Sequence, residues 1–427
     1  MARLSRRSFI KWASMVGALG AYGCSANLSA LREKSVKARI AVVGGGFAGA
    51  SVAKYLKMLG QNLDVTLIER EAVYLSCPGS NEVIADLKRL DELRRDYDIL
   101  GNSQGIRIVR AEINAIDADR RAVLLTDGSA VPYDRLIVAP GIDFRWEEVD
   151  GYDEKASLSV PHAWKAGPQT LLLQRQLRAM PNGGVVLITA PANPYRCPPG
   201  PYERASLIAH FLTRYKPRSK VLILDAKTRF SKQELFLHGW KELYPGMVEW
   251  ISAEREGKID RVDAESRVVF TEFNEYRADV LNVIPPQKAG KLAQSAGLTD
   301  ESGWCPVDPR TFESTIVPGV HIVGDACTAP PMPKSAFAAN SQAKVCAAAV
   351  IDLLQGHEPG PPSLINHCYS FLQPDYAISI TGVYEYSPIE KQLTATSTGE
   401  TPMDGDRRKE AEHARNWQKV IAAEAFG

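Results

Sequence analysis

The sequence IAVVGGGFAG, residues 40–49, decides the fold of this chain. An apolar, strand-like run leads directly into the pattern Gly-x-Gly-x-x-Gly, and a helix-like segment follows from residue 50 to residue 59. In such a turn Gly44 permits the sharp exit from the strand, Gly46 lets the backbone approach a pyrophosphate, and Gly49 lets the helix pack close to the strand. The phosphates then lie at the helix N-terminus, where free N–H groups and the helix dipole favour negative charge.

A second strand-like run, residues 65–69, ends in Glu69, twenty positions after Gly49. An acidic residue at this distance is placed to hold a ribose hydroxyl of the nucleotide. The glycine pattern and the acid together predict a dinucleotide-binding domain. A later strand, residues 133–138, ends in a turn of small residues, of which Ala139 and Gly141 are expected to contribute to the same cofactor site. Between these strands a small sheet is predicted from three short runs, residues 106–111, 113–116 and 122–125.

The composition is that of an ordinary globular protein with two or three domains: 427 residues, 45% hydrophobic and 24% charged, with a net charge of +1. Nothing in it indicates nucleic-acid binding. Arg6 and Arg7 precede a mild apolar stretch that ends at Gly23, which resembles a twin-arginine export signal and predicts a periplasmic protein exported in its folded state. A membrane anchor is the alternative, although the stretch is short for a span. Cys24 is a weaker candidate for lipidation.

A second nucleotide-binding unit is expected in the middle of the chain, but without a glycine loop. Its first strand, residues 185–188, is followed by TAPANPYRCPPGPYE, residues 189–203. Proline has no N–H to offer a phosphate, and its ring prevents close approach. The sequence therefore predicts a nucleotide-binding scaffold that has lost its nucleotide. Residues 221–225 are expected to form its next strand.

The chain is predicted to return to the first domain near residues 319–326, where a strand ends in Gly324 and Asp325. This pair is the second signature of flavoproteins, in which the Asp usually hydrogen-bonds the ribityl chain, so the expected cofactor is FAD. Ser335 opens an alanine-rich helix that extends to Leu354. The positive N-terminal end of this helix would stabilise a reduced, anionic flavin.

These elements predict an α/β fold with two Rossmann-like dinucleotide-binding domains, the second without nucleotide, and a C-terminal interface region. The expected segments are a twin-arginine signal and linker (1–35), the first part of the FAD-binding domain (36–150), a degenerate NAD-binding-like domain (151–285), the second part of the FAD-binding domain (286–360) and a C-terminal interface domain with the second redox cysteine (361–427).

The cysteines are the candidates for chemistry beside a flavin. The sequence has no Cys-x-x-Cys-His motif for haem and no cysteine pair with the spacing of a zinc site, so we expect neither haem nor metal on this chain. Cys77 lies in a loop expected near the flavin ring. Cys197 precedes a predicted helix, residues 202–215, whose N-terminus would lower the pKa of a nearby thiol. From position alone, each could equally be a buried, inert thiol.

Several segments resemble the flavoprotein subunit of flavocytochrome c sulfide dehydrogenase, a relative of sulfide:quinone reductases among the disulfide-reductase flavoproteins. The resemblance extends over essentially the whole mature chain. The run Cys-Pro-Pro-Gly-Pro-Tyr-Glu carries most weight, because it is long and chemically unusual. The segments are Val42–Gly46, Cys77 with Ser80–Ile84, Pro161–Gly167, Arg196–Ser206, Gly303–Asp308, Gly324–Cys327 and Pro331–Ser335.

The resemblance implies a role for four residues. Cys77 would attach FAD covalently through an 8α-thioether, and Cys197 and Cys368 would form a redox-active disulfide with Glu203 as a nearby proton-transfer group. Hydrosulfide would attack this disulfide, and the electrons would pass through FAD to the haem of a separate c-type cytochrome subunit. The other cysteines are expected to be structural: Cys305, Cys327 and Cys346.

The sequence leaves other functions open. A sulfide:quinone reductase would share the flavin and the cysteine pair, but those enzymes usually have amphipathic C-terminal helices, whereas residues 406–416 are heavily charged without a broad apolar face. An NADH-dependent flavin reductase is disfavoured by the prolines between residues 191 and 199. A non-catalytic electron-transfer or assembly subunit that only holds FAD is disfavoured by the cysteine pair.

Overall fold

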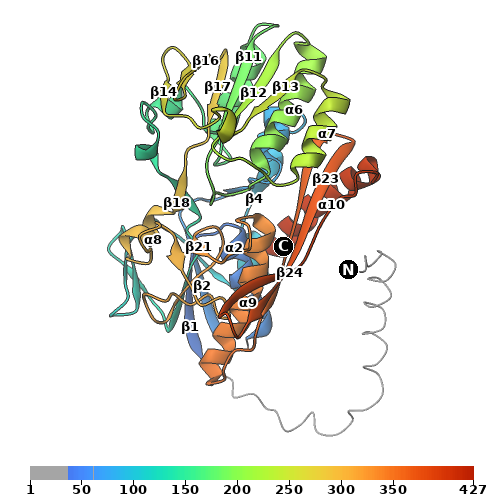
Figure 1. Cartoon of the computed structure of the whole chain (residues 1–427). Coiled ribbons are helices and arrows are strands. Elements are labelled where there is room, and N and C mark those ends of the chain that lie inside the picture. Colours follow the sequence, from blue (N-terminus) through green and yellow to red (C-terminus); the bar gives the residue numbers. More distant parts are fainter. Residues whose placement is uncertain (1–36, 61) are drawn as a thin grey trace. The chain divides into compact units, whose positions relative to one another are not determined.

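The computed structural model describes residues 37–60 and 62–427 (Figure 1). The predicted export signal and Cys24 lie outside the described residues. The described chain is built around two parallel sheets, joined through a C-terminal antiparallel sheet. This is the predicted α/β fold class with two Rossmann-like sheets.

The first sheet has five parallel strands in the order β20-β9-β1-β2-β5. Its central strands are apolar and buried almost throughout, as expected for a parallel sheet that is covered on both faces. Because β1 is central and pairs with β2 and β9, the loop that follows it lies in the middle of the sheet edge. The strands are β1 (Ala38–Val43), β2 (Leu63–Glu69), β5 (Arg107–Arg110), β9 (Arg135–Val138) and β20 (Val320–Ile322).

Two long helices pack against each other beside this sheet, α2 (Phe47–Leu59) and α9 (Ala336–Gln355). Both are rich in buried alanine, which lets the helix axes approach closely. A buried hydrogen bond joins them, since the Asn340 side-chain amide donates to Ser51 Oγ at 2.8 Å. The predicted alanine-rich helix thus exists, and Ser335 is its N-cap.

The predicted small sheet was partly wrong. It contains β6 (Ile113–Asp117), β7 (Ala122–Leu125) and β8 (Ala130–Pro132), whereas β5 is the edge strand of the first large sheet, parallel to β2. An edge strand has one polar side, so its pattern resembles that of a strand in a small exposed sheet. The register is fixed by a side-chain contact that the pattern does not reveal, because Arg107 donates to the Thr66 hydroxyl.

The second parallel sheet has four strands in the order β13-β12-β11-β17. The predicted strands and helix of this unit are confirmed, each one or two residues longer than expected. The elements are β11 (Val185–Ala190), β12 (Lys220–Asp225), β13 (Val248–Ile251), β17 (Val280–Val283), α5 (Pro168–Ala179), α6 (Gly200–Tyr215) and α7 (Gln233–Leu243).

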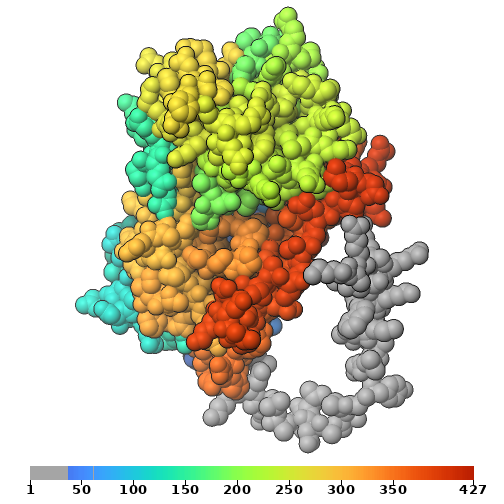
Figure 2. All heavy atoms as spheres, in the orientation of Figure 1, coloured from blue at the N-terminus to red at the C-terminus, as the bar shows by residue number. Residues whose placement is uncertain are grey.

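The C-terminal part is a three-stranded antiparallel sheet followed by a helix. Its first strand contacts α6, α7 and α9, so it lies against both parallel units. Figure 2 shows this segment in red along the green second unit and the orange α9 region. The elements are β22 (Ser363–Gln373), β23 (Tyr376–Ser387), β24 (Gln392–Glu400) and α10 (Arg407–Phe426).

Shorter elements connect these layers. They are β3 (Tyr74–Leu75), α3 (Ser80–Ile84), β4 (Arg94–Arg95), α4 (Asp98–Asn102), β10 (Ile142–Phe144), β14 (Arg261–Asp263), β15 (Val268–Phe270), β16 (Glu275–Arg277), β18 (Gln287–Ala289), α8 (Lys291–Ser295), β19 (Cys305–Pro306) and β21 (Cys327–Thr328). Within residues 37–60 and 62–427, no helix combines the length and the apolar character needed to cross a bilayer.

Candidate active site

The three glycines of the first loop have distinct surroundings. Gly44 has φ +91°, and a Cβ there would lie 2.4 Å from the carbonyl oxygen of Ala139. At Gly49 a Cβ would lie 1.8 Å from the carbonyl oxygen of Gly44, so only glycine permits this approach of helix to strand. At Gly46 a Cβ would meet nothing closer than 3.5 Å, the ring of Tyr74. The backbone of Gly46, where α2 begins, is therefore open to a phosphate group.

Glu69 lies at the end of β2, directly beside the glycine loop. Its Oε2 accepts a hydrogen bond from the Gly45 N–H at 2.6 Å, and its Oε1 accepts from the Glu71 N–H at 2.9 Å. On the other side of the loop, the Tyr97 hydroxyl donates to the Gly45 carbonyl at 3.0 Å. The predicted ribose-binding acid and the predicted phosphate loop thus form one hydrogen-bonded unit.

The last helix of the chain also reaches this loop, which the sequence analysis missed. The Phe426 ring stacks on Tyr74 at 5.4 Å between centroids and meets Phe47 edge-on at 5.5 Å. Tyr97 is a third aromatic neighbour, at 6.2 Å. Aromatic pairs at these separations stabilise by roughly 0.5–1.5 kcal/mol each beyond their buried area. The C-terminus therefore helps to hold the dinucleotide loop.

The second flavin signature and Cys77 meet at Arg196. The Arg196 guanidinium donates from Nε to Asp325 Oδ2 at 2.7 Å and from Nη1 to Cys77 Sγ at 3.5 Å. Gly141, with φ +65°, lies against the same guanidinium. The second oxygen of Asp325, Oδ1, is buried and has no hydrogen-bond partner. A buried acceptor of this kind is suited to a ribityl hydroxyl, so these residues fit FAD.

Gly324 and Ser335 set the backbone on either side of this signature. Gly324 has φ +83°, and its N–H donates to Gln342 Oε1 at 2.9 Å. The Ser335 hydroxyl caps α9 by accepting from the Ala338 N–H at 3.0 Å and donates to Asn366 Oδ1 at 2.6 Å. Through Asn366, the N-terminal end of α9 is fixed to strand β22.

Cys197 and Cys368 come together although 171 positions separate them in the sequence. Cys197 lies in the loop before α6, where its N–H donates to the Lys334 carbonyl at 2.8 Å. Its φ of +57° is unusual for a non-glycine residue and persists only where the surroundings enforce it. Cys368 points inward from β22. Burial, followed by the nearby Cys368 thiol, raises the pKa of Cys197, and both residues are free thiols in the structure.

Glu203, in the first turn of α6, is fixed beside this pair. Its Oε2 accepts from the Asn81 side-chain amide at 2.8 Å, and its Oε1 accepts from the Phe371 N–H at 2.9 Å. Burial raises the pKa of Glu203, although both hydrogen bonds favour its charged form. Its charge in turn acts on both Cys197 and Cys368. The predicted proton-transfer group and the predicted cysteine pair therefore lie in one site.

Two buried cations complete the site, and the sequence analysis missed both. Arg204 is 2% exposed and donates to Asn81 Oδ1 at 3.0 Å and to Asn282 Oδ1 at 2.8 Å, and burial lowers its pKa to about 9. Lys232 is 1% exposed and donates to Ser370 Oγ at 2.8 Å. Arg204 directly follows Glu203 in the sequence, so its place on the same predicted helix could have indicated that it belongs to the site. Nothing in the sequence around Lys232 indicates that it belongs to the site.

Three protein-family profiles match the chain. Pyridine nucleotide-disulphide oxidoreductase matches residues 38–166. Sulfide dehydrogenase (flavocytochrome c) flavoprotein chain, central, matches residues 170–285, and flavocytochrome c sulphide dehydrogenase, flavin-binding, matches residues 360–426. The chain belongs to the flavocytochrome c sulfide dehydrogenase flavoprotein family. It is an FAD-dependent oxidoreductase of a family in which a flavoprotein partnered with cytochrome c oxidises sulfide.

Individual relatives agree with this assignment. The sulfide dehydrogenase (flavocytochrome c) flavoprotein chain of Chlorobaculum thiosulfatiphilum is 53% identical over 45 residues, which are 10% of this chain and 94% of that sequence. The mitochondrial sulfide:quinone oxidoreductase of Dictyostelium discoideum is 23% identical over 347 residues, covering 78% of this chain and 73% of the relative. The crystal structure of the sulfide:quinone oxidoreductase from Aquifex aeolicus has the same fold, with a TM-score of 0.70, 16% identity and 92% coverage of both chains.

In the second Rossmann-like unit of this family member, the acid at the position that would bind a nucleotide ribose is already hydrogen-bonded to other side chains of the protein. Asp225 ends β12, where a dinucleotide-binding domain places its ribose-binding acid. It is fully buried, and it accepts from the Tyr202 hydroxyl at 2.6 Å, the Trp250 Nε1 at 2.9 Å and the Lys227 Nζ at 2.6 Å. These donors leave no acceptor for a ribose, in agreement with the prediction that this unit holds no nucleotide.

The remaining cysteines and His367 lie in different surroundings. Cys305 and Cys327 are register partners on the short parallel strands β19 and β21, and Cys346 is buried within α9. His367 lies on the opposite face of β22 from Cys368, as alternation along a strand predicts, with its ring 4.6 Å from Tyr369.

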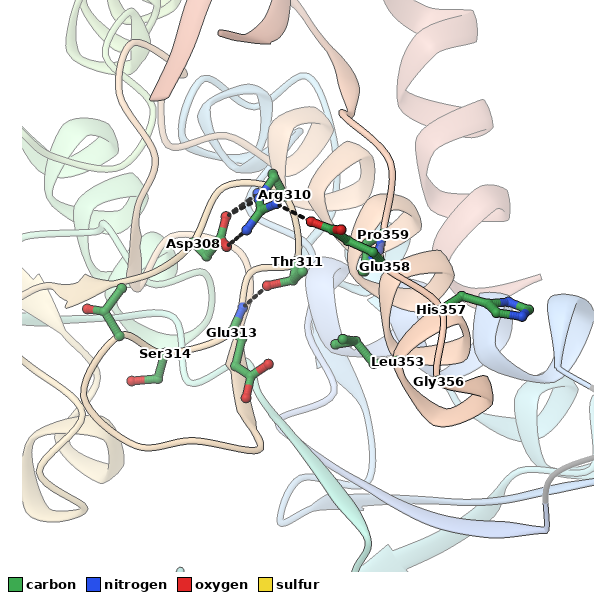
Figure 3. Close-up of a pocket in the computed structure, with 11 residues that line it drawn as sticks. Asp308, Arg310, Thr311, Glu313, Ser314, Leu353, Gly356, His357, Glu358 and Pro359 are labelled. Carbon is green, nitrogen blue, oxygen red and sulfur yellow. Dashed lines mark hydrogen bonds and ion pairs between the residues drawn. The ribbon is translucent and has the colours of Figure 1, made fainter. Parts of the chain in front are cut away.

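A polar hollow of about 570 Å³ lies apart from the predicted site residues, between residues 308–315 and the end of α9 (Figure 3). Its central cation, Arg310, already pairs with Asp308 at 2.9 Å and with Glu358 at 3.3 Å. None of the predicted site residues line it. The hollow is therefore not a candidate for the redox chemistry.

Proposed function

We propose that this protein oxidises hydrogen sulfide to sulfur or polysulfide through a Cys197–Cys368 disulfide and FAD, and passes the electrons to a cytochrome c subunit. The observation that carries the proposal is the meeting of these two distant cysteines beside Glu203. Family membership supports the substrate class and the type of acceptor. Such a sulfur pair suits this substrate, because a disulfide offers hydrosulfide a sulfur to attack and provides the second cysteine as the leaving thiolate.

The FAD would lie along the edge of the first sheet. Its pyrophosphate would be held by Gly44, Gly46 and Gly49, its adenosine ribose by Glu69, and its ribityl chain by Asp325. Lining positions complete the site: Ala139, Gly141, Gly324 and Ser335. When bound, FAD accepts an electron pair from the cysteine pair and hands the electrons on singly.

In the first step, hydrosulfide attacks one sulfur of the disulfide. A new S–S bond forms to the attacked cysteine, which becomes a persulfide, while the other cysteine leaves as a thiolate with the electron pair of the broken bond. A second hydrosulfide then takes the transferred sulfur as the anion HS–S⁻ and leaves a thiol. Oxidation of the resulting thiol and thiolate restores the disulfide and releases two electrons and one proton.

Glu203 is the proposed acceptor of that proton. Its carboxylate is fixed by Asn81 and by the Phe371 N–H, and burial raises its pKa toward the range in which a general base works at neutral pH. The carboxylate lies close enough to the cysteine pair to affect the ionisation of each thiol. These contacts support a role in proton transfer.

Two finer assignments belong to the same proposal. Cys77 is proposed to attach FAD covalently, which is supported by its contact with Arg196 and hence with Asp325. The mature protein is proposed to act in the periplasm, as the paired Arg6 and Arg7 indicate. The partner is proposed to be a c-type cytochrome subunit that carries the haem.

A sulfide:quinone reductase is the second candidate, favoured by relatives that share the fold over most of the chain. Against it, the buried residues of α10 pack onto the protein itself, and its other positions are largely charged. A steady-state assay with cytochrome c in one cell and a soluble quinone in the other separates the two. We expect sulfide-dependent reduction of cytochrome c to exceed that of quinone.

The cysteine pair is tested by alanine variants. Cys197→Ala and Cys368→Ala are each expected to lower sulfide-dependent cytochrome c reduction by at least a factor of about a thousand, because neither leaves a disulfide to attack. Cys346→Ala is the control: this thiol is buried within α9, away from the pair, and its variant is expected to retain activity within about threefold. Full activity of Cys197→Ala would contradict the proposal.

A further inference from the structure

A buried lysine lies beside the cysteine pair without a carboxylate partner. Lys232 is 1% exposed, and its Nζ donates to the neutral Ser370 hydroxyl at 2.8 Å. Among the described residues, no carboxylate forms an ion pair with it. Removing an ammonium from water costs several kcal/mol, and a single neutral hydroxyl does not offset this cost. Burial therefore lowers the pKa of Lys232, and an anion that forms close to it would stabilise its charged form.

The position of Lys232 is enforced by its surroundings. Its backbone is left-handed, with φ +61°, which is unfavourable for a residue with a side chain. It is the residue directly before α7, and its N–H donates to Glu400 Oε1 at 3.1 Å on strand β24. A strained backbone held from two sides is common where a side chain has a specific task.

The groups around the ammonium are unequal partners. They come from every element packed against it: Cys368 and His367 from β22, Cys197 from the loop before α6, Glu203 from α6, and Glu400 from β24. The strongest attraction of Lys232 is to Cys368, ahead of Glu203 and Cys197. Ser370, which holds the ammonium, lies two positions from Cys368 on the same face of β22.

The two cysteines are affected by the same two charged groups, Lys232 and Glu203, but to different degrees. At Cys368, Lys232 and the Ser335 hydroxyl at the N-terminus of α9 favour the thiolate more strongly than Glu203 disfavours it, and Tyr384 of β23 also lies near this thiol. Cys197 is influenced more strongly by the Glu203 carboxylate than by Lys232. Burial raises the pKa of both thiols. Lys232 is the main influence that opposes this rise at Cys368, whereas at Cys197 it is outweighed by Glu203, so a thiolate is less unfavourable at Cys368 than at Cys197.

We propose that Lys232 is the counter-ion of the Cys368 thiolate and thereby directs hydrosulfide to the sulfur of Cys197. This inference rests on the proposed function and adds the direction of attack. The new bond joins the hydrosulfide sulfur to Cys197 Sγ, the Cys197–Cys368 bond breaks, and its electron pair stays on Cys368 beside the ammonium. No further oxidant or proton is needed for this step. Attack on Cys368 would instead leave a thiolate on Cys197, facing Glu203.

The first test locates the transferred sulfur. The oxidised holoprotein is mixed anaerobically with one equivalent of hydrosulfide, alkylated with iodoacetamide, digested and analysed by mass spectrometry. The extra sulfur atom is expected on Cys197 in at least tenfold excess over Cys368. In Lys232→Met this preference is expected to fall at least fivefold, and Lys232→Arg is expected to restore it.

The second test measures ionisation without turnover. The rate of Cys368 alkylation in the reduced holoprotein is followed against pH by peptide mass spectrometry. Loss of the ammonium raises the pKa of Cys368, so Lys232→Met is expected to react at least tenfold more slowly than the parent protein at pH 7 and to regain the rate at higher pH. Lys227→Met is the matched control, since Lys227 is a partly buried lysine of the same β12–α7 loop that pairs with Asp225 instead.

The outcomes are distinguishable. Extra sulfur on Cys368 in the parent protein, or an unchanged alkylation profile in Lys232→Met, would overturn the inference and leave the proposed function intact. Extra sulfur on neither cysteine would overturn the proposed function and the inference with it. An equal slowing in Lys227→Met would assign the effect to general loosening of the structure, which would also overturn the role of Lys232.

Discussion

At the scale of single residues, the glycine loop separates a folding role from a binding role. Gly49 is enclosed by backbone, because an added Cβ would lie 1.8 Å from the Gly44 carbonyl oxygen. Gly46 has room for a Cβ within the protein itself, with Tyr74 at ordinary contact distance. We therefore expect that position 46 is glycine because the pyrophosphate of FAD would occupy the space that a side chain would fill.

Alanine substitutions test this separation. Gly49→Ala is expected to destabilise the protein by about 3 kcal/mol, because helix α2 must move away from β1. Gly46→Ala is expected to fold with nearly normal stability but to lose most of its FAD. Gly399→Ala, at an exposed position of β24 with nothing near, is the control and is expected to change stability by less than about 0.5 kcal/mol. Thermal unfolding and flavin content measure both effects, and a normal flavin content in Gly46→Ala would contradict the assignment.

Cys77 carries a second prediction at this scale. If its sulfur binds FAD covalently, acid precipitation of the parent protein leaves the yellow colour in the pellet, whereas Cys77→Ala releases it into the supernatant. Cys305→Ala serves as the comparison, because this buried cysteine lies on the β19–β21 pair and is expected to leave the attachment unchanged. Flavin that remains in the pellet of Cys77→Ala would refute the attachment through this residue.

At the scale of elements, strand β22 organises the cysteine site by simple alternation. Three residues lie on its inward face. Asn366 accepts a hydrogen bond from Ser335, the N-cap of α9, and Ser370 accepts one from Lys232. Cys368, between them, lies near Cys197. His367 is directed to the other face, toward Tyr369. A one-residue shift of this strand would exchange the two faces and remove Cys368 from the site.

The alternation predicts contrasting effects of neighbouring substitutions. His367→Ala is expected to keep sulfide-dependent cytochrome c reduction within about threefold of the parent rate, because its ring makes no contact with the cysteine pair. Cys368→Ala, one position along, is expected to abolish it. The measurement is the initial rate at saturating sulfide. A loss in His367→Ala as large as that in Cys368→Ala would show that the histidine acts in the reaction.

The elements also indicate how far the sequence can be interpreted alone. The glycine loop, Glu69, the strands around Cys197 and the helix after Ser335 follow from local pattern, because each has a period or a cap that the backbone requires. Strand β5 was assigned to the wrong sheet, because an edge strand of a large sheet and a strand of a small exposed sheet both have one polar side. Lys232 was missed because its burial is created by β22 and β24, which are distant in sequence.

At the scale of the whole described chain, the C-terminal sheet determines where the chemistry takes place. The two parallel sheets supply the FAD loop and Cys197, but the second cysteine arrives only when β22 packs against α6 and α9. The same chain end places Phe426 against the dinucleotide loop. The proposed redox site is therefore completed only by the last part of the described chain, which joins the two Rossmann-like units.

The second Rossmann-like unit bears on the question of the electron donor. Its acid, Asp225, is occupied by Tyr202, Trp250 and Lys227, and prolines follow its first strand where a glycine loop would be needed. A nicotinamide dinucleotide would have to displace these buried partners before it could reach the flavin. This arrangement favours sulfide as the source of electrons over NADH.

The central claim is tested most directly by an anaerobic spectral titration of the purified holoprotein, with sulfide in one cuvette and NADH in the other. The account predicts that sulfide alone bleaches the flavin absorption, that cytochrome c then restores it, and that Cys197→Ala abolishes the response. Bleaching by NADH, or bleaching by sulfide that is unchanged in Cys197→Ala, would contradict the account.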